Sequence, residues 1–342
     1  MSDMLSTNNT TNEALQQFLN RLDKLHSSPT IALRVMELTR DPDFQMEAVA
    51  ECLEHDPALT ASILRLVNSS YYGLVNDVTN LRQALTYLGR RSMRLAVLSF
   101  GLVKTMVSGA PAQFHLQYWK RSLTMAAAAR ECAILLNDPD LDPDTAFSTG
   151  LIADLGMLAI SQLETETYLE IADSEPDHTI DLVRRERAAF GFDHLAVSQQ
   201  LMVRWHLPEA LVEAVGNHHT YLPVSAKLNH VALVANLIAE VIWTPVCPYM
   251  QPLQQVLVRQ LNLHIDDMIS LVLNTKKSIA ESSMIFGVQL PEEIDLRMVE
   301  LQAREMFKVA ALQMAEDLDC IDACSAGSSP EFSGTSCFDR SH

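Results

Sequence analysis

The chain has 342 residues, and 48% of them are hydrophobic, so it is long enough to bury one large core or two of ordinary size. Its formal net charge is −18, and a field of that sign repels phosphate backbones and disfavours general nucleic-acid binding. No uninterrupted run of about 18 apolar residues occurs, and the polar residues 1–11 lack the order of a signal peptide. The sequence therefore predicts a cytoplasmic protein without a membrane span.

Apolar residues recur at helical spacing along the first part of the chain, and glycine is rare. Two predicted helices begin with a capping residue followed by proline, at Ser28-Pro29 and Asp56-Pro57. Gly89 is expected to end a short helix, and residues 68–78 are expected to be non-helical. The predicted helices cover about residues 15–25, 29–38, 46–53, 57–67, 81–88 and 91–107.

Helical periodicity continues beyond a Gly/Pro-containing break at residues 108–111. A second break contains Pro245, Pro248 and Pro252. Between and after these breaks, the predicted helices cover about residues 113–136, 143–163, 178–190, 193–205, 208–218, 224–242, 252–262, 266–280 and 292–318. The sequence thus predicts an all-α protein in which an N-terminal helical bundle packs on a second bundle and is followed by C-terminal helices.

The two breaks and the composition of the ends divide the chain into five segments. The last of them is rich in Ser and Gly, a composition typical of disorder. The segments are a flexible N-terminus 1–12, an N-terminal helical subdomain 13–110, a second helical subdomain 111–245, C-terminal helices 246–322 and a disordered tail 323–342.

The cysteines and one cluster of basic residues are candidates for metal or anion binding. Cys320 and Cys324 form a CxxxC pair without the second pair or the histidines of a zinc site, so no metal is expected there. Cys52, Cys132 and Cys247 stand alone among apolar residues and indicate reduced, buried thiols. The basic cluster is either a solvated helix face, which the sequence favours, or an anion site; it comprises Arg82, Arg90, Arg91, Arg94 and Lys104.

Histidines and a carboxylate gather in the second subdomain. Asp154 lies in one predicted helix, His194 begins another, and His218 and His219 end a third. Imidazoles and a carboxylate that converge from separate helices are the raw material of a metal site in a helical bundle. A single polar residue on such a helix is more often only a satisfied hydrogen-bonding group, so the sequence leaves both interpretations open.

Several separated motifs over about residues 20–240 resemble the HDOD domain, a relative of the HD and HD-GYP phosphohydrolases. The segment 150–157, which reads GLIADLGM, resembles the His-Asp signature of the HD superfamily. The motifs that resemble HDOD domains in particular are DPALT at 56–60, LVNSSYYG at 66–73 and ALTYLG at 84–89. The resemblance implies an HD-like helical subdomain over 111–245.

The resemblance also implies where a catalytic metal would be bound. HD enzymes use a first His, a His-Asp doublet and a distal Asp, and the matching places here hold Arg121, Ala153-Asp154 and Asn236. An alanine methyl offers no lone pair, a guanidinium cannot ligate, and an amide is a poorer ligand than a carboxylate. We therefore expect neither a bound metal nor a catalytic residue. If an ion is held at all, its ligands would be Asp154, His194, His218 and His219, the three histidines matching those that widen the site in HD-GYP enzymes.

These losses favour a non-catalytic bacterial signal-transduction module that binds a regulatory protein or a small signalling ligand in trans, without a cofactor or a membrane. The oligomeric state stays open. One alternative is a residual metal-dependent phosphohydrolase or phosphodiesterase that uses Asp154 and the histidines. Another is a sensor of a phosphate-containing ligand, with Arg121 supplying the positive charge that the metal would have carried. The competing interpretation of Arg121 is a buried ion pair with Asp154, which we favour because it pairs two charges at once.

Overall fold

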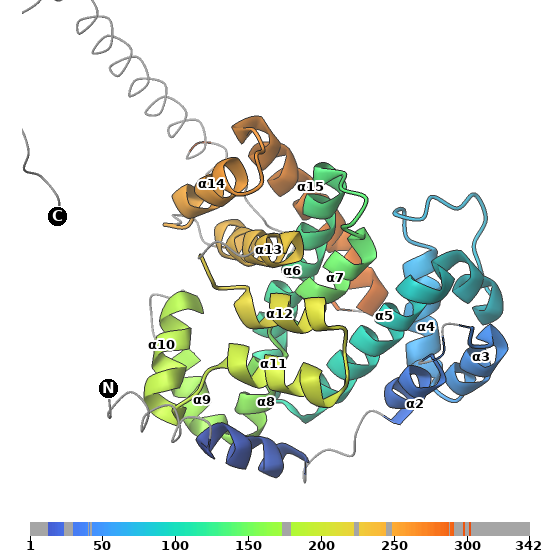
Figure 1. The fold of residues 1–342 in the computed structure, drawn as a ribbon, viewed down its shortest axis with the longest axis horizontal. Coiled ribbons are helices and arrows are strands. Elements are labelled where there is room, and N and C mark those ends of the chain that lie inside the picture. Colours follow the sequence, from blue (N-terminus) through green and yellow to red (C-terminus); the bar gives the residue numbers. More distant parts are fainter. Residues whose placement is uncertain are drawn as a thin grey trace, which may run out of the picture. The chain divides into compact units, whose positions relative to one another are not determined.

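The structure is a computed structural model that describes residues 13–23, 30–39, 41, 43–172, 179–221, 226–243, 248–286, 288–290, 297 and 301. The chain divides into two compact units, Met1–Leu296 and Arg297–His342, and the account below concerns the first. All regular structure among the described residues is helical, which confirms the predicted all-α class (Figure 1).

The helices follow one another with short connections, and residues 13–23 are also helical. The helices before residue 111 are α2 (Thr30–Leu38), α3 (Met46–Glu54), α4 (Pro57–Val67) and α5 (Leu81–Gly109). Those after it are α6 (Ala112–Leu136), α7 (Pro143–Ile152), α8 (Leu155–Leu163), α9 (Thr165–Ala172), α10 (Thr179–Phe190), α11 (His194–Arg204), α12 (Glu209–Asn217), α13 (Lys227–Trp243), α14 (Met250–Arg259) and α15 (Ile265–Phe286).

Local sequence signals set the ends of the N-terminal helices. Asp56 precedes α4, and its carboxylate accepts a hydrogen bond from the amide of Leu59 at 3.0 Å, with Pro57 in the first turn. Gly89 has φ 70°, a left-handed conformation that glycine adopts without steric cost. It therefore forms a kink within α5, at the place where the sequence predicted the end of one helix.

The first helical segment, residues 13–23, contacts the second half of the fold. The ring of Phe18 lies 4.9 Å from the ring of Phe192, which precedes α11. The segment 13–110 that the sequence groups together thus includes a helix with contacts beyond residue 111. In Figure 1 this dark blue segment lies beside α8 and α9, away from α2.

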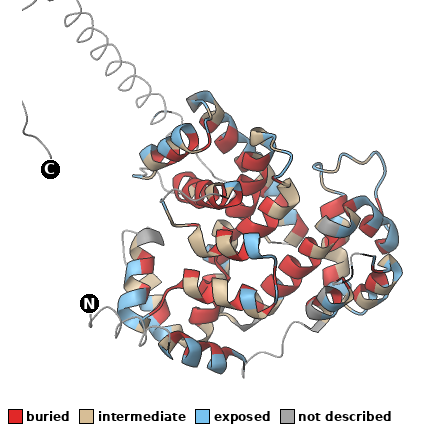
Figure 2. Ribbon diagram, viewed as in Figure 1, coloured by how far each residue is buried: buried red, intermediate tan, exposed pale blue. Residues whose placement is uncertain are grey.

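The core of the second half is built on α6, which packs against α7, α13 and α15. Residues 143–163 do not form the single helix that their periodicity predicts, because α7 ends at Ile152 and α8 begins at Leu155. The break places Asp154 at the start of α8, in the protein interior. Figure 2 shows that buried residues dominate these central helices.

The helical residues Pro143–Leu163 are long and apolar enough to cross a membrane, but 89% of their most apolar stretch is buried within the protein. These residues therefore belong to the buried core of the protein.

Three of the five residues of the basic cluster form ion pairs with acidic side chains of the N-terminal half. The ion pairs are Arg82–Glu54, Arg90–Asp43 and Lys104–Asp56. Cys52 and Cys132 are free thiols, as expected, although Cys52 is only half-buried. Burial raises the pKa of the Cys132 thiol to about 12.

The C-terminal helices α14 and α15 occupy the predicted positions, and α15 extends six residues beyond its predicted end to Phe286. Several predictions lie outside the described residues: the terminus 1–12, the cap Ser28-Pro29, Cys247, the helix 292–318, the pair Cys320 and Cys324, and the tail 323–342.

Candidate functional site

The structure brings together all six residues that the sequence singled out. They come from five places in the fold; Asp154, His194, His218 and Asn236 are buried, and Arg121 and His219 are partly buried. Arg121 lies on α6, Asp154 lies between α7 and α8, His194 begins α11, His218 and His219 follow α12, and Asn236 lies on α13.

Arg121 is the centre of a buried polar cluster. Its Nε donates to Oδ2 of Asp154 at 2.5 Å, and its Nη1 donates to Oε1 of Glu240 at 2.6 Å. Its Nη2 donates to Oδ1 of Asn236. All three guanidinium nitrogens are therefore hydrogen-bonded, and two carboxylates surround one permanent positive charge. Of the two interpretations of Arg121, the ion pair with Asp154 is the arrangement in the structure.

The ion pair controls the protonation of Asp154. Burial alone would raise the pKa of this carboxyl, but Arg121 and the hydrogen bond from His218 hold it well below its usual value. Burial would likewise lower the pKa of Arg121, while Asp154 and Glu240 raise it. Both groups are therefore charged at neutral pH, and the arginine supplies the positive charge that a carboxylate in an apolar core requires.

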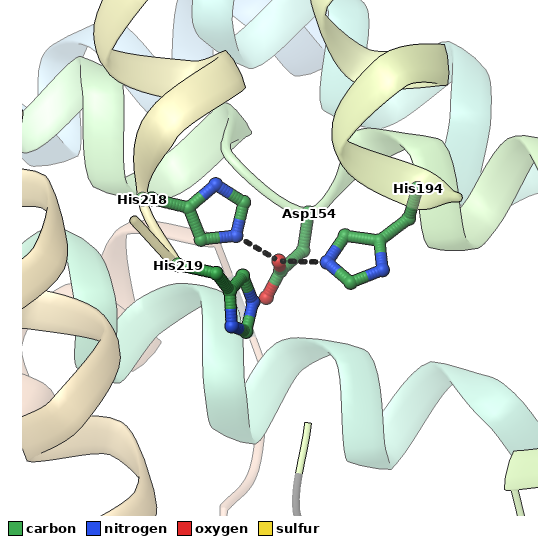
Figure 3. Close-up of side chains that lie close together, drawn as sticks. All are labelled: Asp154, His194, His218 and His219. Atoms are coloured by element: carbon green, nitrogen blue, oxygen red, sulfur yellow. Dashed lines mark hydrogen bonds and ion pairs between the residues drawn. The ribbon is translucent and has the colours of Figure 1, made fainter. Parts of the chain in front are cut away.

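His194 and His218 both approach Oδ1, the other oxygen of Asp154, and His219 lies beside the same carboxylate (Figure 3). Nε2 of His218 lies 3.1 Å from Oδ1 of Asp154, and Nε2 of His194 lies 3.7 Å from the same atom. His219 completes a group of four whose ligand atoms all lie within 4.8 Å of one another. The buried Nε2 atoms of His194 and His219 have no hydrogen-bond partner among the described residues. By number and donor type, these four residues fit one divalent ion such as Zn²⁺ or Fe²⁺.

A second carboxylate orients His194 through Nδ1, the ring nitrogen that does not approach Asp154. Oε2 of Glu186, on α10, lies 2.7 Å from Nδ1 of His194 and also accepts its backbone amide at 2.9 Å. The other oxygen, Oε1, accepts a hydrogen bond from the hydroxyl of Tyr168 at 3.0 Å. Burial lowers the pKa of His194, but Glu186 outweighs it, and the net shift is upward. Carboxylate support of this kind fixes the tautomer and direction of an imidazole.

His219 occupies a different environment from His194. Burial, together with the neighbouring His218, His194 and Arg121, lowers the pKa of His219 well below its usual value. It is therefore neutral at physiological pH. A cavity of about 580 Å³ opens beside it, with Arg184 and Arg187 of α10 among its lining residues. The cluster thus borders, at His219, a cavity with both basic and acidic residues in its wall.

Two local features align the helices that carry Asp154 and His194. Asp193 caps α11, and its Oδ1 accepts the amide of Ala196 at 2.8 Å, so the helix begins at His194. A Cβ placed on Gly156 would lie 2.2 Å from the carbonyl oxygen of His194. Only glycine permits this approach of α8 to α11, and the approach brings the imidazole next to the carboxylate.

Sequence reasoning missed three residues of the network: Glu240, Glu186 and Tyr168. Glu240 stands four residues after Asn236 in the apolar helix α13, and this spacing places both on one helix face. An acidic residue in so apolar a helix was a usable signal. Glu186 lies in the run Arg184–Arg187, which has the appearance of a solvated charged face, so its burial could not be read from sequence.

Comparison with known proteins identifies the family. The family model of the HDOD domain matches residues 25–221, more than half of the chain. An uncharacterized protein of Treponema pallidum (strain Nichols) is 22% identical over 205 residues, which are 58% of this chain but only 38% of that protein. The matched region therefore spans well under half of the relative.

Three solved structures have a similar fold. An HDOD domain protein with unknown function from Geobacter sulfurreducens has a TM-score of 0.62 and 24% identity and covers 81% of this chain and 99% of its own. A proposed phosphohydrolase from Shewanella amazonensis SB2B has a TM-score of 0.60, 23% identity and coverage of 79% and 97%. A proposed signal transduction protein from Marinobacter aquaeolei VT8 has a TM-score of 0.61, 18% identity and coverage of 82% and 66%. The chain belongs to the HDOD domain family.

Proposed function

We propose that this chain is a non-catalytic, cytoplasmic regulatory module that acts in trans on a partner protein or a small signalling ligand. The observation that carries the proposal is the position of Arg121, whose guanidinium bonds Asp154, Asn236 and Glu240. These are the surroundings in which the resemblance to HD enzymes would place a catalytic cation.

The chemistry of the cluster supports the loss of hydrolysis. Arginine stays charged at any pH that a folded protein tolerates, so it neither ligates a metal nor accepts a proton from water. Ala153, beside Asp154, contributes no ligand atom. A hydrolytic metal centre must lower the pKa of a bound water, and a fixed cation on one oxygen of its carboxylate opposes binding of a metal there. In the proposed module, the Arg121 cluster balances the buried charges and takes no part in activating water.

A regulatory role agrees with the family. HDOD domains are found among bacterial regulators. The similar structure from Marinobacter aquaeolei is named as a proposed signal transduction protein. A module that keeps the fold without the reaction would act through its surface and its cavities. The partner would then recognise the folded module itself.

We expect no turnover when the purified protein is assayed with Mn²⁺, Fe²⁺ or Mg²⁺ against cyclic dinucleotides and phosphodiesters. The Asp154→Asn variant is the matched control, because it removes the carboxylate with little change in shape. Hydrolysis by the wild-type protein that disappears in this variant would contradict the proposal. Equal residual rates in both proteins would indicate a contaminant and leave the expected result standing.

A single-ion site is the second candidate, and the clustering of four ligand atoms within 4.8 Å favours it. An ion on Oδ1 of Asp154 would have His194, His218 and His219 as its other ligands, while Arg121 keeps Oδ2. The bound ion would stabilise the fold or make the protein a metal sensor. Metal analysis of the same preparations distinguishes the two: one equivalent of ion, lost in His218→Ala and kept in His230→Ala, would establish this candidate. His230 lies on α13 outside the cluster.

A further inference from the structure

A second cavity, of about 280 Å³, lies where the N-terminal half, α6 and α15 meet. It is lined by the loop residues Ser69, Ser70 and Tyr71, which follow α4, and by residues of α6, α7 and α15. Arg130 of α6 lines it, nine residues after Arg121, which corresponds to about 14 Å along the helix axis. This cavity is therefore separate from the histidine cluster.

Arg130 is a buried cation with an unused donor. Its guanidinium lies between two rings, 4.0 Å from the centroid of Tyr71 and 4.1 Å from that of Phe147. Nη2 donates to Asp144 at 2.8 Å, and only 8% of the Arg130 side chain is exposed. Nε is also buried but has no hydrogen-bond partner among the described residues. A buried donor without an acceptor is costly, so a shift of the guanidinium that brought this nitrogen to a ligand oxygen in the cavity would be favoured.

The other charged side chains that line this cavity are one lysine and two glutamates. Lys277 of α15 supplies a second cation, and no described residue forms an ion pair with it. Glu131 and Glu281 supply two carboxylates, which accept hydrogen bonds from Ser278 and Ser70 respectively. Two positive and two negative side chains thus face one small space.

We propose that this cavity binds a small zwitterion of the amino-acid class, with its carboxylate toward Arg130 and Lys277 and its ammonium toward Glu131 and Glu281. Such a ligand adds no net charge and offers a complement to each sign of charge in the wall. A free phosphate would add negative charge beside two carboxylates, and the polar wall does not favour an apolar ligand. The volume lies at the small end of ligand cavities, which suits a single amino acid.

The site would give the module a chemical input. The ligand would touch both the loop after α4 and the helix α15, segments that already meet through the hydrogen bond from Ser70 to Glu281. Binding would therefore stabilise the junction between the N-terminal half and the C-terminal helices. The inference does not rest on the fate of the Arg121 cluster.

The test is calorimetric titration of the full-length protein with each of the protein amino acids, accompanied by thermal unfolding. Acetate, methylammonium and inorganic phosphate serve as probes that carry only part of the ligand chemistry. We expect at least one amino acid to bind with a dissociation constant below about 1 mM. Saturation with it should raise the unfolding temperature by about 2 °C or more.

Three variants locate the binding. Lys277→Met and Glu281→Gln change side chains at the cavity rim and should each weaken binding at least about tenfold. Lys276→Met, at the neighbouring position of the same helix and outside the cavity lining, should leave binding unchanged. The proposal fails if no amino acid binds, if acetate or phosphate binds as tightly as the zwitterion, or if the two rim variants bind like the wild-type protein.

Discussion

Arg121→Met will lower the free energy of unfolding by about 3–5 kcal/mol, since removing one partner of a buried ion pair leaves an uncompensated charge. In this protein the substitution leaves the buried carboxylates of Asp154 and Glu240 without the cation that they share. Chemical denaturation followed by circular dichroism at neutral pH measures the effect. A loss below about 1 kcal/mol would show that the cluster is not a stabilising ion pair.

The matched control is Arg21→Met. Arg21 forms an ion pair with Glu164 at 2.6 Å, but its side chain is 54% exposed. Exposed pairs contribute about 0–1 kcal/mol, so this variant should be nearly as stable as the wild-type protein. The comparison separates the loss of one arginine from the loss of the buried charge.

The cost of Arg121→Met should also depend on pH. In the wild-type protein the pKa of Asp154 is held below its unfolded value, so the stabilisation is present above about pH 4 and is lost as the pH falls through the folded pKa. Without Arg121, burial raises that pKa, and a proton then neutralises the carboxylate in mild acid. The difference in free energy of unfolding between the two proteins should therefore shrink as the pH falls from 7 toward 4.

Gly156→Ala will destabilise the protein by about 3 kcal/mol or more, beyond the usual range for overpacking, because the clash is with backbone. The added Cβ would lie 2.2 Å from the carbonyl oxygen of His194, and a backbone atom cannot move aside without shifting α11. That shift would also disturb the hydrogen bond from the Gly156 amide to Ser198, 2.8 Å long. Equilibrium unfolding measures the loss, and the histidine resonances of an NMR spectrum report the shift of His194.

Gly73→Asn is the control for this prediction. Gly73 has φ 57°, a conformation that asparagine tolerates, and a Cβ there would meet no atom closer than 3.9 Å. Its effect on stability should stay below about 1 kcal/mol. If Gly156→Ala is as mild as Gly73→Asn, the close approach of α8 and α11 is not required for the site.

The helices could be predicted from sequence because their signals are local. The cap Asp56-Pro57 and the kink at Gly89 depend on residues within one or two turns, and both are present in the structure. The break at Ala153-Asp154 was missed for the opposite reason. Residues 143–163 are apolar throughout at helical spacing, and the break depends on the packing of α8 against α11, which periodicity does not encode.

The candidate site could be predicted in part. Asp154, His194, His218 and His219 were found because polar residues of those types are unusual in an apolar bundle. Arg121 was found only through the resemblance to HD enzymes. Glu186 was missed because an acidic residue inside a basic run reads as exposed, whereas its carboxylate is fully buried against His194 and Tyr168.

Crystals grown with Mn²⁺ and examined by anomalous scattering would test most directly whether Arg121 takes the place of a catalytic cation. We predict that its guanidinium stays bonded to Asp154, Asn236 and Glu240, and that no anomalous peak lies among the oxygens of those three side chains. A Mn²⁺ peak at those oxygens, with Arg121 displaced from Asp154, would contradict the account.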